Sequence, residues 1–320
     1  MSMCLPGSLQ KLFRDFPHIL FQDYPLRGKN TWGVGGKAVL ACFPERHEQV
    51  VSLAQELDLL EGFPYAVLGG GSNVLISDKG FSGCVIFTEK LDRVFILPEI
   101  SSREPEEIMV YVDSGVSLGR LLRFCREHFL GGLEFSVGIP GSIGGALVGN
   151  AGAQGEAIGN VVRYVDVLLP NAVLQRIPAS DIVWGYRFSS LSRKQCMILG
   201  CALGLCQKSS DTLEKNISFF AEKRKAQPVL RKTAGSVFKN PCGGYAGKLL
   251  ELSGCKGKKI GGARVSVKHA NFIENYNEAS GQDILDLIFL CRKMVAEHTG
   301  TILYPEVRFV GFESSEILFY

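Results

Sequence analysis

Two glycine-rich runs constrain this chain more than any other feature of its sequence. The first covers residues 69–73 and the second residues 138–145, and each follows an apolar stretch. Glycine tolerates positive φ and lets the main chain approach a neighbour closely, and successive N–H groups in such turns form a concave donor site for anions. Because the two runs lie far apart in sequence, we infer that they can hold one long ligand, such as a diphosphate, from two sides.

Neither run fits the common nucleotide signatures. No Gly-Lys-Ser/Thr follows to make a P-loop, and no G-x-G-x-x-G opens a helix as a dinucleotide-binding βαβ unit requires. The first run is also compatible with a simple tight turn between strands at Tyr65–Leu68 and Val74–Ile76. Glycine continues through 149–155, however, and so long a purely structural stretch costs much backbone entropy.

Size and composition indicate a globular enzyme-sized protein. The chain has 320 residues, 46% of them hydrophobic, which is enough for two or three compact units. A net charge of +3 gives no reason to expect a nucleic acid or membrane partner, and the ten cysteines show no zinc-like spacing, so we expect no metal. The N-terminus has no uninterrupted apolar segment and no stretch approaches the ~18 residues of a membrane span. We therefore expect a cytoplasmic protein with reduced thiols.

Basic residues are concentrated in the C-terminal third, between 223 and 232 and between 256 and 268. Each alone is typical of a solvated basic face. Together, and beside the glycine pairs at 243–244 and 261–262, they favour an anionic ligand.

The pattern of apolar residues and of Gly and Pro divides the chain into three blocks, 1–90, 91–209 and 210–320. In the first we expect a helix after Pro44 with Val50, Val51, Ala54 and Leu57 on one face. The second is expected to hold a strand at Ile108–Val112, a helix that has Leu118, Leu121, Leu122 and Cys125 on one face and stops at Gly131–Gly132, and strands at Val161–Leu169 and Met197–Leu205.

In the third block we expect a helix from about Asp211 that ends before Pro228, because proline disfavours helix at the preceding residue. Ser280, with Asp283 three residues later, resembles a helix start, and this helix should continue to Gly300. A last strand is expected at Glu306–Val310. Since no regular β-α-β rhythm appears, the predicted fold class is α+β.

Seven segments in this order resemble the UDP-N-acetylenolpyruvoylglucosamine reductase family. That family has two FAD-binding subdomains of the vanillyl-alcohol oxidase type and a C-terminal α+β substrate-binding domain, which agrees with the three blocks. The absence of an inserted loop that would supply a tyrosine implies the shorter form of the family. Small departures are Cys255 before Lys-Gly and Trp32 at a position often filled by phenylalanine. The matching segments are 30–36, 69–78, 132–153, 186–189, 234–241, 269–273 and 304–308.

The resemblance implies FAD as cofactor, and because no histidine stands where covalent attachment would be expected, the FAD should be non-covalent. The glycine runs would lie against its pyrophosphate and residues 150–153 near the flavin. The cofactor-binding residues implied are Trp32, Val34, Gly69, Gly70, Gly71, Ser72, Asn73, Gly138, Ile139, Pro140, Gly141, Ser142, Gly144, Gly145, Asn150, Ala151, Gly152 and Ala153.

The resemblance also implies that NADPH reduces FAD and that UDP-N-acetylglucosamine enolpyruvate then takes hydride, giving UDP-N-acetylmuramate for peptidoglycan. Hydride arriving at the terminal alkene carbon pushes negative charge onto the adjoining carbon and its carboxylate, so the site needs fixed positive charge and an acid. Arg187 matches the carboxylate grip, Ser236 the proton donor and Glu306 an assisting acid. Outside these motifs, Arg187 would be interpreted as a surface residue and Ser236 as a loop serine. Glu306 would be interpreted as a glutamate that opens an edge strand and pairs with Arg308.

Weaker assignments concern the substrate and the phosphates of NADPH, and a structural role for Lys239 or Gln227 stays open. Two other functions also remain: a different FAD oxidase or dehydrogenase of the same superfamily, and a non-catalytic binder of a dinucleotide or nucleotide sugar. We expect a monomer. The substrate-binding residues implied are Tyr186, Arg224, Gln227, Lys239, Asn240, Lys268 and His269.

Overall fold

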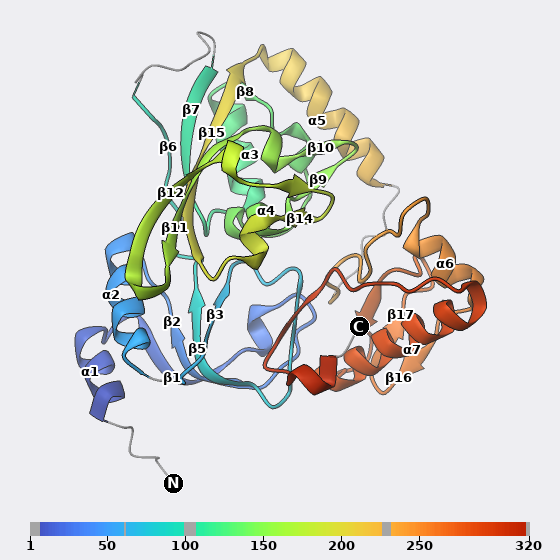
Figure 1. Ribbon diagram of the computed structural model, residues 1–320. Coiled ribbons are helices and arrows are strands. Elements are labelled where there is room, and N and C mark those ends of the chain that lie inside the picture. The colour runs from blue at the N-terminus through green and yellow to red at the C-terminus, as the bar shows by residue number, and fades with distance from the viewer. Residues whose placement is uncertain (1–6, 61, 99–106, 226–231, 318–320) are drawn as a thin grey trace. The chain divides into compact units, whose positions relative to one another are not determined.

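The computed structural model describes residues 7–60, 62–98, 107–225 and 232–317, and the chain forms two compact units (Figure 1). Unit 1 comprises Met1–Gln22, Leu40–Gly70 and Cys84–Arg224, and unit 2 comprises Asp23–Val39, Gly71–Gly83 and Lys225–Tyr320. These units are defined by packing and not by the ligand that each would bind. The division into domains 1–90, 91–209 and 210–320 therefore stays a prediction.

A six-stranded sheet with the order β12-β11-β15-β7-β6, in which β8 also pairs with β15, organises unit 1. Its neighbouring strands are antiparallel. Residues 197–205 of β15 are all buried, so the apolar run that predicted this strand reflects burial on both faces. The strands are β6 (Val94–Ile96), β7 (Glu107–Asp113), β8 (Leu130–Gly131), β11 (Val162–Leu169), β12 (Val173–Pro178) and β15 (Met197–Gln207).

Two helices of unit 1, α2 (His47–Asp58) and α3 (Leu118–Glu127), have a predicted apolar face, and each needs one correction. In α2 the buried face consists of Val50, Leu53, Ala54 and Leu57, whereas Val51, which the apolar pattern places on this face, is only half-buried. The helix α3 ends at Glu127 and not at the expected Gly131–Gly132. Among the described residues of unit 1, the α-helices are α1 (Gly7–Asp15), α2 (His47–Asp58), α3 (Leu118–Glu127), α4 (Ile143–Gly149) and α5 (Ser210–Lys225).

The early end of α3 has a local cause. Phe129 has a φ of 58°, which lies in the left-handed region and does not continue a right-handed helix. Residues 130–131 then pair with β15 as a short strand. A sequence pattern that places the stop at the next glycine pair misses this turn.

A second sheet has the order β1-β2-β5-β3. Its β3 and β5 are parallel, with Tyr65 opposite Cys84 and Leu68 opposite Phe87. Two short antiparallel hairpins, formed by β9 with β10 and by β13 with β14, also lie in unit 1. The strands are β1 (Leu20–Pro25), β2 (Lys37–Cys42), β3 (Tyr65–Leu68), β5 (Phe81–Phe87), β9 (Gly152–Ala153), β10 (Glu156–Ala157), β13 (Trp184–Gly185) and β14 (Phe188–Ser189).

In unit 2 a long helix, α7, packs against a three-stranded antiparallel sheet (Figure 1). Its predicted start is confirmed: Ser280 Oγ accepts from Asp283 N, the Asp283 side chain reaches back to Ser280 N, and Gly300 ends the helix with a φ of 70°. Among the described residues, the α-helices and strands that lie wholly in unit 2 are β4 (Val74–Ile76), α6 (Ala246–Leu252), β16 (Lys259–Ile260), β17 (Ala263–Val265), β18 (Ile273–Asn275), α7 (Gly281–Thr299) and β19 (Arg308–Val310).

The last strand of unit 2 starts later than expected. It begins at Arg308 and pairs in parallel with β4, so Glu306 lies in the segment before the strand and does not open it. In the part of the chain that the structure describes, parallel and antiparallel strand pairs and helices are mixed without a repeating β-α-β unit, which confirms the α+β prediction.

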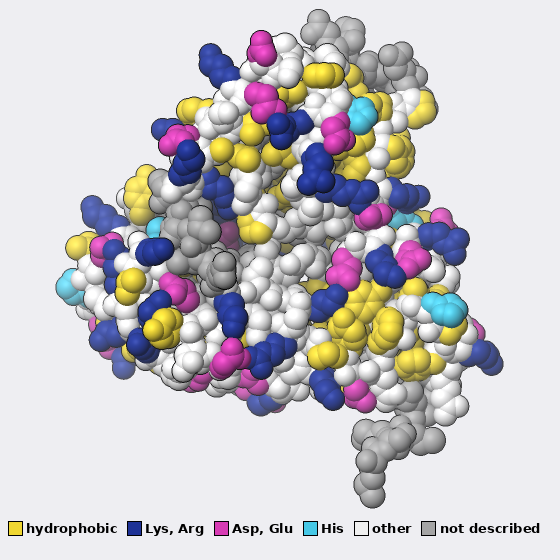
Figure 2. All heavy atoms as spheres, turned by 180° about the vertical axis from the view of Figure 1, so that it is seen from behind, with side chains coloured by type: hydrophobic (Ala, Val, Ile, Leu, Met, Phe, Trp, Pro, Cys, Tyr) yellow, Lys and Arg dark blue, Asp and Glu magenta, His cyan; other side chains and the backbone are white. Residues whose placement is uncertain are grey.

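The surface displayed in Figure 2 carries Lys and Arg interspersed with Asp, Glu and hydrophobic side chains. Within the described ranges, no helix combines the length and apolar composition that a bilayer span requires. In the same residues, no group of three or more His, Cys, Asp or Glu side chains could hold a metal ion.

Candidate active site

Gly69 and Gly70 of the first glycine run meet the second run within unit 1. A Cβ atom at Gly69 would lie 2.1 Å from Ser142 Oγ, and one at Gly70 would lie 3.2 Å from Gly141 Cα. Real Cβ atoms do not approach neighbours as closely as the first of these contacts. Glycine at these positions therefore permits the close approach of two segments about 70 residues apart.

The second run is held by main-chain hydrogen bonds to the turn that precedes α3. Gly144 N donates to Ser114 O at 2.8 Å, Ile143 N to Val116 O at 2.9 Å and Leu118 N to Gly141 O at 3.1 Å. Gly141 has a φ of 119°, a conformation that other residues rarely adopt. The geometry of the run is thus fixed by its partners rather than left as a free loop.

Two buried hydroxyl groups lie at this junction. The residues Ser142 and Ser114 are 4% and 0% exposed, and among the described residues neither Oγ has a hydrogen-bond partner. An unpaired buried hydroxyl is costly, and a phosphate oxygen would satisfy it. A glycine cradle with orphaned hydroxyl groups therefore fits the pyrophosphate of FAD.

The segment expected to approach the flavin is tied to the hairpin that carries Arg187. Asn150 has a φ of 45°, and its side chain donates to Gly185 O at 3.0 Å and accepts from Gly159 N at 3.1 Å. Arg187 Nη1 donates to Gly152 O at 2.9 Å. The side chain of Asn150 therefore has a structural role. Arg187 lies directly beside the 150–153 segment.

Arg187 itself has an uncommon backbone conformation, with a φ of 51°. A non-glycine residue in this region is strained unless its surroundings hold it there, and such strain is found at functional sites. Its neighbour Tyr186 is 61% exposed, and the guanidinium carbon of Arg187 lies 5.6 Å from the centre of the Tyr186 ring. The tyrosine ring is thus available to a ligand.

Arg224, at the end of α5, contacts the start of the second glycine run. A Cβ atom at Gly138 would lie 2.9 Å from Arg224 Cδ and Nε. Burial, followed by the positive charge of Arg187, lowers the pKa of Arg224. Two like charges that lie close enough to repel each other favour an anionic ligand beside them.

In unit 2 the structure brings Ser236 and Glu306 together, although 70 positions separate them. Glu306 N donates to Val237 O at 2.7 Å, and Phe238 and Pro305 form a β-bridge. Asn73, from the first glycine run, donates through Nδ2 to Glu306 O at 3.1 Å. Residues predicted as proton donor, assisting acid and cofactor ligand therefore share one region of this unit.

The predicted substrate residues of unit 2 differ in their surroundings. Asn240 Oδ1 accepts from Ala246 N at 3.0 Å, so its side chain meets the first turn of α6. His269 Nδ1 accepts from Asn271 N at 3.2 Å, and burial, then the charge of Lys256, lowers the pKa of His269. Lys239 is half-buried, Lys268 is exposed, and Gln227 lies outside the described residues.

Two of the predicted cofactor residues belong to the interior of unit 2. Trp32 is fully buried, and its Nε1 donates to Ile273 O at 2.8 Å. Val34 is 2% exposed. The contacts of Trp32 anchor its loop to β18 and explain its burial without a cofactor. The part of Trp32 and Val34 in cofactor binding therefore stays a prediction. The other members of the glycine runs, Gly71, Ser72, Ile139, Pro140, Gly145, Ala151 and Ala153, lie within the segments described above.

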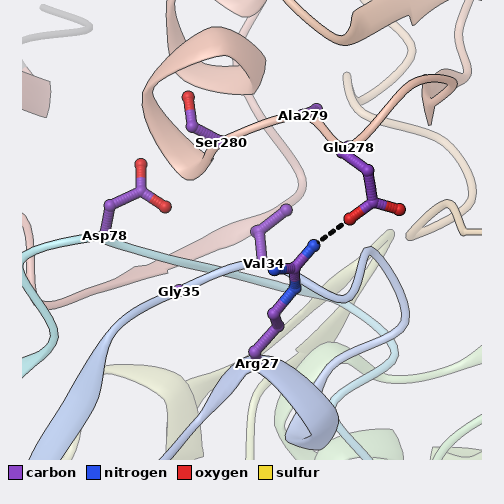
Figure 3. A pocket seen from close by; sticks show the side chains of 7 residues that line it. All are labelled: Arg27, Val34, Gly35, Asp78, Glu278, Ala279 and Ser280. Carbon is purple, nitrogen blue, oxygen red and sulfur yellow. Dashed lines mark hydrogen bonds and ion pairs between the residues drawn. The ribbon is translucent and has the colours of Figure 1, made fainter.

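Val34 also lines a pocket of about 240 Å³ in unit 2 (Figure 3). Arg27 reaches across this pocket to Glu278, and the Asp78 carboxylate accepts from Gly281 N and Gln282 N at the start of α7. The charged groups around the pocket thus have partners in the protein. We assign no ligand to it.

Sequence reasoning missed Asn271. Its side chain is buried and holds the segment that follows Ser236 through hydrogen bonds to Phe238 N and Phe238 O. The only signal was its place inside the 269–273 motif, since a polar residue within an apolar stretch gives no indication of its partner. Asp78 was likewise inside a motif, without an assigned role as the cap of α7.

Two protein-family models match this chain. Residues 39–177 match the model of an FAD binding domain, and residues 227–310 match the model described as UDP-N-acetylenolpyruvoylglucosamine reductase, C-terminal domain. The first match contains both glycine runs. The second contains Ser236 and Glu306.

Similar proteins cover nearly the whole chain. UDP-N-acetylenolpyruvoylglucosamine reductase of Caldicellulosiruptor bescii is 38% identical over 295 residues, which are 91% of this chain and 90% of that protein. The Heliobacterium modesticaldum reductase is 37% identical over 311 residues, 97% of this chain and 96% of that protein. The crystal structure of the Thermus caldophilus reductase superimposes with a TM-score of 0.72 at 29% identity and covers 91% of this chain and 98% of its own. The resemblance is therefore confirmed, and the chain belongs to the UDP-N-acetylenolpyruvoylglucosamine reductase family.

Proposed function

We propose that this protein is an FAD-dependent oxidoreductase that uses NADPH to reduce UDP-N-acetylglucosamine enolpyruvate to UDP-N-acetylmuramate. The observation that carries this proposal is the match of reductases along more than nine-tenths of the chain, together with the FAD-binding and C-terminal domain models. A different oxidase with the same FAD-binding fold would not require the match over residues 227–310.

The FAD would be held without a covalent bond by the glycine runs. Ser142 and Ser114 supply the orphaned hydroxyl groups, and Gly69 and Gly70 leave the space that a side chain would fill. When bound, FAD supplies a carrier that takes hydride from NADPH and gives hydride to an alkene carbon. The protein's own residues must then bind the substrate, manage the charge that develops on it and deliver a proton.

Arg187 would bind the carboxylate of the enolpyruvyl group. Its guanidinium is planar and permanently charged, so it can meet both carboxylate oxygens. Negative charge grows on this carboxylate as hydride reaches the terminal carbon, and a fixed cation stabilises that state more than the starting alkene. The hydrogen bond from Nη1 to Gly152 O supports this role because it fixes the direction of the side chain.

Ser236 would protonate the carbon that bears the carboxylate. A hydroxyl is a weak acid, so it can act here only because that carbon becomes strongly basic during the reaction. Glu306 would assist by hydrogen bonding to, or protonating, the carboxylate as it gains charge. The main-chain hydrogen bond between Glu306 and Val237 supports this pairing of roles.

The remaining polar residues would bind the UDP diphosphate, the sugar and the phosphates of NADPH. Arg224 is supported by its contact with Gly138, Tyr186 by its exposed ring, and Lys239 and His269 by their places beside the Ser236 segment. Asn240, Lys268 and Gln227 complete the proposed set.

We further propose a cytoplasmic monomer that acts in peptidoglycan precursor synthesis, and hence in cell shape and division, without a nucleic acid or membrane partner. A UDP-sugar and NADPH are cytoplasmic metabolites, which supports this location. The net charge of +3 is too small to suggest a polyanionic partner.

Two observations on purified protein test the proposal. A yellow preparation that releases FAD on denaturation is expected, since no covalent link is proposed. NADPH oxidation should depend on added UDP-N-acetylglucosamine enolpyruvate. A colourless protein that does not take up FAD would contradict the cofactor assignment, and NADPH oxidation that is indifferent to the enolpyruvyl ether would favour another oxidase or dehydrogenase.

A further inference from the structure

Asn271 is a buried polar residue that contacts the segment following Ser236. It is 4% exposed and lies just before β18. Its main-chain O accepts from Val237 N at 2.9 Å, and its N donates to His269 Nδ1 at 3.2 Å. Burying an amide side chain without hydrogen-bond partners would cost free energy. The partners of Asn271 therefore indicate which part of the chain it holds in place.

Both polar atoms of its side chain bind the same residue. Asn271 Oδ1 accepts from Phe238 N at 2.9 Å, and Nδ2 donates to Phe238 O at 2.8 Å. This reciprocal pair imitates the hydrogen bonds of a neighbouring β-strand, and it fixes the direction of both peptide groups at Phe238. An adjacent β-bridge joins Ser236 to Phe272.

The opposite side of the same segment is held by the residues around Glu306. Glu306 N donates to Val237 O, and Lys239 N donates to Tyr304 O at 2.9 Å. The segment therefore lies between two supports, one of which depends on a side chain. Gly235, which precedes Ser236, has a φ of 78°, so loss of one support would leave the serine next to a flexible residue.

We propose that Asn271 is a positioning residue that holds the Ser236 hydroxyl in place for proton delivery. The inference rests on the proposed function, in which Ser236 is the acid. Asn271 does not need to touch the substrate. A misplacement of about 1 Å can reduce a chemical step about 100-fold, and the Phe238 pair restrains the main chain only two residues from Ser236.

Hydrogen exchange of the wild-type protein gives a first test that does not depend on activity. The Phe238 amide, bonded to the buried Asn271 side chain, should exchange at least about 100-fold more slowly than an exposed loop amide. In Asn271→Ala this protection should fall by about tenfold or more. Exchange of the wild-type amide at the rate of an exposed loop would overturn the proposal, whether or not the enzyme assignment is correct.

The second test separates the half-reactions by stopped flow. In Asn271→Ala we expect protonation-dependent reoxidation by the enolpyruvyl ether to slow about 10- to 100-fold, while flavin reduction by NADPH changes less than about twofold. Val295→Ala is the matched control, because Val295 is fully buried in the core of unit 2 and is not hydrogen-bonded to the serine segment. It should lower Tm and leave both half-reactions near wild type. Equal slowing of both half-reactions by Asn271→Ala, or of neither, would overturn the proposal.

Asn271→Asp provides a variant whose reoxidation rate should recover at low pH. A neutral carboxyl group can accept from Phe238 N and donate to Phe238 O as the amide does, whereas a carboxylate can only accept. Relative to wild type, the reoxidation rate of this variant should therefore rise at least about fivefold from pH 8 to pH 5.5, since burial raises the pKa of an aspartic acid. His269, Lys239 and Glu306 lie on the surrounding segments and are present in both proteins. Dividing the rate of the variant by the rate of wild type at each pH therefore removes the effect of their own titration. A ratio that does not change with pH would contradict the role. Failure of the wild type to reoxidise would instead contradict the proposed function, and the exchange experiment would still decide the position of the serine segment.

Discussion

The substitution Gly69→Ala tests the cofactor cradle most sharply. The backbone of Gly69 lies outside the left-handed region, so alanine adds only a contact, at 2.1 Å from Ser142 Oγ. An ordinary contact needs at least 3.4 Å, so the hydroxyl must move or rotate away from the cradle. Overpacking of this kind costs about 1–3 kcal/mol. Because bound FAD needs the hydroxyl in its present place, this cost falls on the FAD-bound form and should weaken FAD binding about 5- to 150-fold.

A double variant separates the steric effect from general damage. In Gly69→Ala/Ser142→Ala the nearest contact becomes the Cβ atom of residue 142, at 3.3 Å, and the pair should bind FAD as Ser142→Ala does alone. Gly119→Ala is the control, because nothing lies within 4 Å of its added Cβ in α3; it should stabilise unit 1 by about 0.5–1 kcal/mol. FAD affinity is measured by flavin fluorescence titration. Binding of Gly69→Ala within twofold of wild type, or a double variant that binds FAD more weakly than Ser142→Ala alone, would refute the reasoning.

Three further predictions concern chemistry and pH. Ser236→Ala should retain flavin reduction by NADPH and lose about 10²- to 10⁴-fold in reduction of the enolpyruvyl ether; equal loss in both, seen by stopped flow, would contradict its role as acid. Arg187→Lys keeps the charge but loses the planar fork, so kcat/KM for the ether should fall about 10- to 150-fold, as for loss of one charge-assisted hydrogen bond, with unchanged flavin reduction as the control. Burial would raise the pKa of Asp113, but hydrogen bonds from His47 and Arg93 outweigh it and hold that pKa below its ordinary value. The stabilisation is therefore present above the unfolded pKa of about 3.9 and is lost as pH falls through the folded pKa. In Asp113→Asn, the free energy of unfolding in urea should fall less steeply as the pH is lowered than it does in wild type. An unchanged pH dependence would count against this linkage.

Local signals in the sequence predicted several elements well. The Ser280 and Asp283 pair and Gly300 mark the two ends of α7, because capping needs only residues within one turn. The strand limits at Tyr65–Leu68 and Val74–Ile76 agree with β3 and β4, since the glycine turn between them interrupts the apolar pattern. In both cases the information lies within a few residues.

Features that depend on distant partners could not be derived in this way. Glu306 lies before β19 because its main chain pairs with Val237, and no local pattern indicates that partner. Asn271 holds Phe238 from 33 positions away. The family resemblance supplied the identity of Ser236 and Glu306, whereas their proximity through main-chain hydrogen bonds required the structure.

The most direct test of the account follows the wild-type protein through both half-reactions in a stopped-flow spectrometer. The account predicts that NADPH bleaches the bound FAD, that UDP-N-acetylglucosamine enolpyruvate restores its colour in the absence of oxygen, and that the product has the mass of UDP-N-acetylmuramate. An FAD that NADPH reduces but the enolpyruvyl ether leaves reduced would contradict it.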